Sequence, residues 1–107
     1  MADMPCRYAK EYLKLPVEEI DFFDYKPKSN YYDLLTMWDV LEHIDNCNEV
    51  IKKCYSMLKT GGYIILQVPQ IDSYIAEKQK EKWQAMGLDH VNYFSKKTIT
   101  KLLEDEG

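Results

Sequence analysis

Three side chains with chemical potential lie close together near the middle of this sequence. If a helical turn begins near Asp39, then Asp39, Glu42 and His43 occupy positions i, i+3 and i+4 and share one face. With a carboxylate to orient it, His43 could act as a general base toward a hydroxyl or amine. Together with His90, the same groups supply two carboxylates and two imidazoles, which suit a divalent cation. The third alternative is a capping or packing role near the start of a helix.

The elements that must position these side chains follow from the apolar pattern around them. Compact apolar runs at residues 31–38 and 63–68 predict two strands, each buried on both faces. Between them, residues 46–58 carry apolar side chains at helical spacing, and Gly61 or Gly62 can end that helix. A strand, a helix and a strand in this order form a βαβ unit with parallel neighbouring strands. The expected fold class is therefore α/β.

Shorter elements flank the βαβ unit. Residues 6–13 show helical spacing, residues 17–23 fit a short strand, and residues 95–107 predict a final amphipathic helix. The polar stretch 75–86 predicts a loop and an exposed helix. Because a chain of 107 residues can build only one small core, we expect a single domain over residues 1–107.

Composition excludes several function classes. The chain has 14 basic and 18 acidic side chains, a net charge of -4, and no basic stripe, so we expect no nucleic-acid partner. Its apolar runs are too short to span a bilayer and no signal peptide is visible, which predicts a cytoplasmic protein without a membrane partner. Cys6, Cys47 and Cys54 lack metal-site or redox spacing and are expected to be reduced thiols.

Three ordered strings carry a family resemblance. They are T-M-W-D-V-L-E-H-I, then L-K-T-G-G-Y-I-I-L-Q-V-P, and finally D-H-V-N-Y-F-S, within residues 31–107. Together they resemble class I S-adenosylmethionine-dependent methyltransferases of the D-V-L-E-H branch. The resemblance implies a partial Rossmann-like, mostly parallel sheet with flanking helices, incomplete at both ends. It also implies methyl transfer to an oxygen, nitrogen or carbon of a small-molecule substrate.

The same resemblance implies roles for residues near the cofactor. Asp21 and Phe22 would meet the adenine amino group and ring, although a solvated acid beside a core aromatic residue is an equal alternative. Met37 and Trp38 would border the methionine part of S-adenosylmethionine, since ligands of open α/β sheets collect at the carboxyl ends of strands.

On the acceptor side, the resemblance implies a pocket lined by Trp83, His90 and Tyr93. The alternative for these aromatic residues is that they cover a sheet edge. The D-x-x-E-H pattern with His90 is similar to the E-x-x-E-H and downstream histidine of small-RNA 2′-O-methyltransferases and some quinone-pathway O-methyltransferases. By this resemblance a divalent metal would be held by Asp39, Glu42, His43 and His90. The sequence departs from the pattern at Asp39, which stands where those proteins have a glutamate and is one methylene shorter.

The sequence departs from the family at the glycine-rich cofactor loop. Its only glycines are Gly61, Gly62, Gly87 and Gly107, and none forms the loop or the G-x-G-x-x-G of a nicotinamide-dependent enzyme. We therefore expect weak or absent binding of S-adenosylmethionine by this chain alone. The family's sheet would leave the strand at residues 17–23 unpaired, which predicts re-pairing or association with a second copy. The rival interpretation is a non-catalytic interaction module, or one half of a split methyltransferase completed by another chain.

Overall fold

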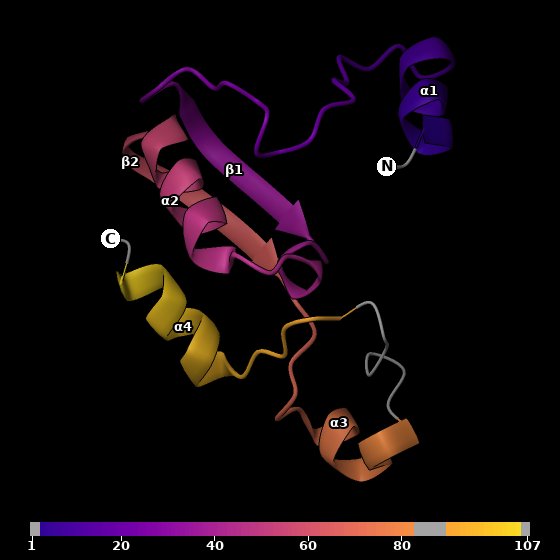
Figure 1. Cartoon of the computed structure of the whole chain (residues 1–107), viewed down its shortest axis with the longest axis vertical. Coiled ribbons are helices and arrows are strands. Elements are labelled where there is room, and N and C mark those ends of the chain that lie inside the picture. Colours follow the sequence, from indigo (N-terminus) through magenta and orange to yellow (C-terminus); the bar gives the residue numbers. More distant parts are fainter. Residues whose placement is uncertain (1–2, 83–89, 106–107) are drawn as a thin grey trace.

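The computed structural model describes residues 3–82 and 90–105. In chain order the elements are α1 (Asp3–Glu11), β1 (Tyr32–Trp38), the 3-10 turn η1 (Leu41–His43), α2 (Cys47–Met57), β2 (Leu58–Gln67), α3 (Tyr74–Gln79), the 3-10 turn η2 (Lys80–Lys82) and α4 (Lys96–Asp105). Figure 1 shows α2 lying along the two strands, α4 nearby, and α1 apart from both. The α/β class predicted from the sequence is confirmed.

The sheet consists of β1 and β2, paired in parallel. Their register runs from Leu34 opposite Tyr63 to Trp38 opposite Gln67. Because α2 carries the chain back between them, both carboxyl ends meet at one edge, where the Asp39 amide donates to the Gln67 carbonyl over 3.0 Å. The predicted βαβ unit is therefore present.

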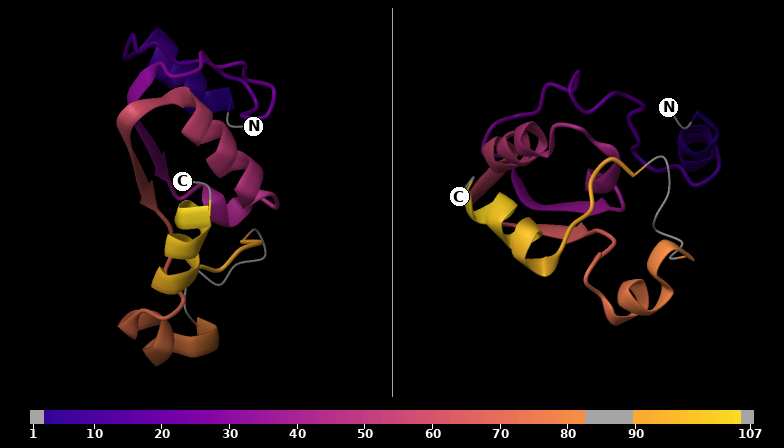
Figure 2. Two further views of the ribbon diagram at one scale, coloured as in Figure 1. Left: turned by 90° about the vertical axis from the view of Figure 1, so that its left-hand side faces the viewer. Right: turned by 60° about the horizontal axis from the view of Figure 1, so that its bottom comes forward.

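The core lies between α2 and one face of the sheet, which we call the inner face. Its buried members are Leu41, Cys47, Val50, Ile51, Cys54 and Phe94. Side chains packed against them from the inner face and α4 include Leu35, Met37, Ile64, Leu66, Ile99, Leu102 and Leu103. Figure 2 shows α2 and α4 against the sheet from two further directions. The core therefore lies on one side of the sheet.

The prediction that both strands are buried on both faces is wrong. Alternate side chains point to opposite faces of a strand, and only one set is covered. On the opposite face Leu34 of β1 lies beside Tyr63 of β2, and Trp38 lies beside Gln67. Leu34, Trp38 and Tyr63 are all exposed. In the part of the chain that the structure describes, no helix lies over this second face, which we call the outer sheet face.

The glycine pair has a different role from the helix termination predicted for it. Helix α2 ends at Met57 and β2 begins immediately at Leu58, so Gly61 and Gly62 lie inside the strand. They coincide with a shift of register between Tyr32 and Leu34 of β1. Gly61 has a φ of +80°, and a Cβ on Gly62 would stand 2.9 Å from the Lys59 carbonyl oxygen. The glycines therefore permit an irregularity where the strand follows directly on the helix.

The strand predicted at residues 17–23 is absent. This segment is irregular and ends in a turn, while Phe22 packs against the core and Lys53 Nζ lies 4.9 Å from the Phe22 ring centroid. A strand needs a neighbour to satisfy its backbone groups, and none of the described strands runs beside this segment. The expected orphan strand consequently does not form.

The terminal helices agree more closely with the sequence prediction. Helix α1 starts three residues earlier than predicted, and α4 is capped by a reciprocal pair. The Ser95 hydroxyl accepts from the Thr98 amide over 3.1 Å, and the Thr98 hydroxyl accepts from the Ser95 amide over 2.8 Å. None of the described helices is both long and apolar enough to cross a membrane.

Candidate functional site

The candidate site follows directly on the carboxyl end of β1. Asp39 takes a left-handed backbone conformation with φ of 52°, and the helical turn η1 begins only at Leu41. The turn predicted to start near Asp39 therefore starts two residues later, and Asp39 lies outside it. Leu41 has no exposed surface, and it anchors the turn in the core.

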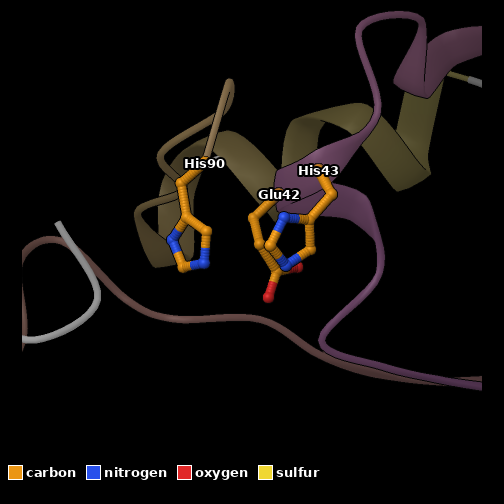
Figure 3. Close-up of side chains that lie close together, drawn as sticks. All are labelled: Glu42, His43 and His90. Atoms are coloured by element: carbon orange, nitrogen blue, oxygen red, sulfur yellow. The ribbon is translucent and has the colours of Figure 1, made fainter. Parts of the chain in front are cut away.

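Glu42, His43 and His90 converge beyond this turn (Figure 3). One ligand atom from each of these residues lies within 4.8 Å of the others. The rings of His43 and His90 meet edge to face, with centroids 4.6 Å apart and planes at 81°. A carboxylate and two imidazoles thus share one small volume, although His90 comes from a distant part of the chain.

Burial makes the Glu42 carboxyl group the most unusual member of the cluster. Its residue is 1% exposed, and neither carboxyl oxygen has a hydrogen-bond partner among the residues that the structure describes. Within the same described ranges, Nδ1 of His90 is also buried without a partner. A buried carboxylate without compensation is costly, so this arrangement favours a bound cation.

Backbone and side-chain hydrogen bonds hold the two halves of the cluster together. The amides of Val91 and Asn92 donate to the Glu42 carbonyl over 2.8 and 3.1 Å. The Asn92 side-chain amide donates to the carbonyls of Leu41, over 3.2 Å, and Ile44. The sequence analysis did not identify Asn92. Only its position two residues after His90 could have indicated a role in the site.

Asp39 does not join the three clustered side chains. It is exposed, and its carboxylate accepts from Gln67 Nε2 over 3.2 and 3.4 Å. Of the predicted acceptor-pocket residues, Tyr93 lies near the cluster, with its ring centroid 6.3 Å from that of His90. Trp83 lies outside the described residues.

The residues predicted to contact the cofactor fall in two places. Met37 and Trp38 lie at the carboxyl end of β1, where Met37 packs against the core and Trp38 is exposed. Asp21 and Phe22 lie in the irregular segment before β1, and the Asp21 carboxylate accepts from the Phe23 amide over 2.8 Å. The packing of Phe22 on the core matches the structural alternative for that residue.

The cysteines add no reactive group to the site. All three are free thiols, and Cys47 and Cys54 are buried. Burial raises the pKa of the Cys47 thiol and raises that of Cys54 to about 11. Both groups therefore stay protonated at neutral pH and are poor nucleophiles or metal ligands.

Known proteins provide an independent comparison. The profile of a methyltransferase domain family matches residues 4–107. Ubiquinone biosynthesis O-methyltransferases of Bordetella avium and Acinetobacter baylyi are 33% and 32% identical to this chain over 54 residues. Each match covers 50% of this chain and 21% of the enzyme. An uncharacterized protein of Methanocaldococcus jannaschii is 28% identical over 81 residues, covering 75% of this chain and 40% of that protein.

No solved structure matches the chain significantly. The family profile nevertheless spans almost the entire sequence, and the parallel strands with their connecting helix have the arrangement that the resemblance implied. The chain therefore belongs to the class I S-adenosylmethionine-dependent methyltransferase family.

Proposed function

We propose that this chain supplies the acceptor-activating part of an S-adenosylmethionine-dependent O-methyltransferase, in which Glu42, His43 and His90 hold a divalent metal ion. The observation that carries the proposal is the buried Glu42 carboxylate, which has no described hydrogen-bond partner and lies beside two imidazoles. The relatives named as O-methyltransferases favour an oxygen nucleophile on a small-molecule substrate.

The donor set suits the proposed ion. Two imidazole nitrogens and a carboxylate are typical ligands of Mn²⁺, Fe²⁺, Co²⁺ or Zn²⁺. A divalent ion at this place would lower the pKa of an acceptor hydroxyl and stabilise the resulting oxyanion. Asp39, which the resemblance added as a fourth ligand, is engaged by Gln67 instead, so we assign three protein ligands.

Methyl transfer sets the remaining tasks of the protein. The bond between the sulfonium sulfur and the methyl carbon breaks while a carbon–oxygen bond forms, and the acceptor hydroxyl loses its proton. His43 is exposed beside the buried Glu42, which supports a second candidate role in which its imidazole takes that proton as a general base. In both roles we assign His90 and Tyr93 to the border of the acceptor site.

We assign Met37 and Trp38 to the methionine side of the cofactor because they lie at the carboxyl end of β1 in a parallel sheet. We likewise assign Asp21 and Phe22 to the adenine side of the cofactor. Since the sequence contains no glycine-rich cofactor motif, these 107 residues should bind S-adenosylmethionine weakly by themselves, and activity should need a partner or second copy. Calorimetric titration giving micromolar affinity would contradict this.

Metal binding is tested by titrating the chain with Mn²⁺ and counting free ion by electron paramagnetic resonance. We expect one ion per chain, and Glu42→Gln or His90→Ala should weaken its affinity at least about tenfold. Asp45→Asn, an exposed carboxylate next to the turn, is the matched control and should change nothing. Undiminished affinity in Glu42→Gln would refute the metal site.

A second experiment separates the metal role from the general-base role and from a non-catalytic module. Transfer of labelled methyl groups to a panel of phenols is measured with Mn²⁺, with a chelator, and for His43→Ala. Transfer that survives the chelator but not His43→Ala favours the general base. Absence of transfer, even with a complementing chain that carries the glycine-rich loop, favours the interaction module.

A further inference from the structure

Two uncovered apolar surfaces stand out from the rest of the molecule, and the first is the outer sheet face. It consists of Leu34, Trp38, Tyr63 and Ile65, which are 50%, 57%, 73% and 45% exposed. Leu34 is opposite Tyr63, Ile65 is opposite Thr36, and Trp38 is opposite Gln67, so the four apolar side chains are spread over both strands of this face. In an α/β domain a sheet surface of this composition is normally covered by a helix.

The second surface is one side of α1 and of the turn that follows it, which we call the α1 stripe. Met4, Tyr8 and Tyr12 follow one another at intervals of four residues and are 81%, 56% and 73% exposed. The rings of Tyr8 and Tyr12 stack on each other, with centroids 5.1 Å apart and planes at 21°. Both figures of the whole chain place α1 away from the sheet. Its apolar side chains recur at the spacing of a buried helix face, but they are exposed to solvent.

The segment that connects α1 to β1 is tied to α2, and α1 does not cover the outer sheet face of its own chain. Lys53 of α2 donates to the carbonyls of Phe22 and Phe23, and the Asn30 amide donates to the Ser56 carbonyl. These bonds tie the segment that follows α1 to α2, which packs on the inner face. Helix α1 precedes this tethered segment and lies apart from the sheet in both figures of the whole chain.

We propose that two copies of this chain exchange α1, so that the α1 stripe of each lies on the outer sheet face of the other. Such an exchange is isologous and closes after two subunits. From about 150–250 Å² per large aromatic side chain, each helix-on-sheet contact buries roughly 900 Å², and two contacts reach the roughly 1,600 Å² of a standard stable interface. This proposal does not depend on the metal site.

The test uses two variants of the full chain and their mixture. The stripe variant carries Tyr8→Ser and Tyr12→Ser, and the sheet variant carries Tyr63→Ser and Ile65→Thr. Sedimentation equilibrium should find the unaltered chain dimeric at micromolar concentration and each variant at least about a hundredfold weaker in dimerisation, because both contacts are damaged. Tyr55→Ser with Tyr74→Ser, which removes equally exposed tyrosines elsewhere, should leave the dimer unchanged.

Mixing the two variants separates exchange from the other arrangements. The sheet variant still has an intact stripe and the stripe variant an intact sheet face, so a mixed dimer keeps one native contact and should reappear. A mixture that stays monomeric would overturn the exchange, as would a monomeric unaltered chain. A stripe variant that remains fully dimeric would show that the sheet faces stack directly, which also refutes it. Circular dichroism checks that both variants keep their helices.

Discussion

At the scale of single residues, Glu42 combines a structural position with a chemical one. Its neighbour Leu41 is completely buried and fixes the turn. The Glu42 carbonyl accepts hydrogen bonds from the backbone amides of Val91 and Asn92. The carboxyl group is therefore held rigidly in a place where water cannot solvate it. An unpaired buried carboxylate destabilises the fold, so a carboxylate in such a position more often has a catalytic or binding role than a structural one.

Asn92 offers the sharpest mutational test of how the cluster is positioned. Asn92→Leu keeps the side-chain volume but leaves the carbonyls of Leu41 and Ile44 unpaired, which should cost about 1–3 kcal/mol in free energy of unfolding. It should also weaken Mn²⁺ binding about 10–100-fold, because His90 loses its alignment with Glu42. Urea unfolding and the Mn²⁺ titration measure the two effects, with the exposed Asn48→Leu as control. Unchanged Mn²⁺ affinity would limit Asn92 to a structural role.

The Cys54 thiol makes a prediction about pH. Burial raises its pKa from 9.0 to about 11, so the unfolded chain releases this proton at a lower pH than the folded chain. The free energy of unfolding should consequently fall as pH rises from 9 toward 11, and Cys54→Ser, whose hydroxyl does not titrate there, should flatten that decline. Urea unfolding across this range measures it. An identical decline in the variant would assign the effect to other groups.

At the scale of elements, the junction of α2 and β2 depends on glycine. A Cβ at Gly62 would meet the carbonyl oxygens of Lys59 and Asp33 at 2.9 and 3.2 Å, and backbone atoms cannot move aside cheaply. Gly62→Ala should therefore lower the free energy of unfolding by about 1–3 kcal/mol. Chemical denaturation measures the change, with the exposed Thr60→Ala as control. Equal stability of the two variants would mean that β2 can relax around the added methyl group.

At the scale of the whole molecule, two strands and one layer of helices form a small core. An isolated two-stranded sheet is marginal, and the outer sheet face adds exposed apolar surface. If two copies cover each other, association stabilises the folded state by mass action. The melting temperature should then rise with protein concentration, and this dependence should vanish in the stripe variant. Calorimetry over a hundredfold range of concentration measures it.

Local pattern was sufficient for several features. The apolar spacing of α2, the two apolar runs of β1 and β2, and the order of strand, helix and strand predicted the parallel βαβ unit correctly. Glu42, His43 and His90 were also recognisable as candidate ligands from residue type and resemblance. The inferences about the elements succeed because helix and strand periods record which side chains face a neighbouring layer.

Only the tertiary structure decided which of the candidates meet and which surfaces stay open. Asp39 leaves the cluster because its backbone turns to the left-handed region, whereas His90 enters it because Asn92 bonds the distant segment to η1. The outer sheet face looks fully buried in the sequence, since an apolar run shows that a strand can be covered twice. Whether a second layer of helices covers the outer sheet face depends on the path of the whole chain and of any partner. The periodicity of a strand carries no information about that path.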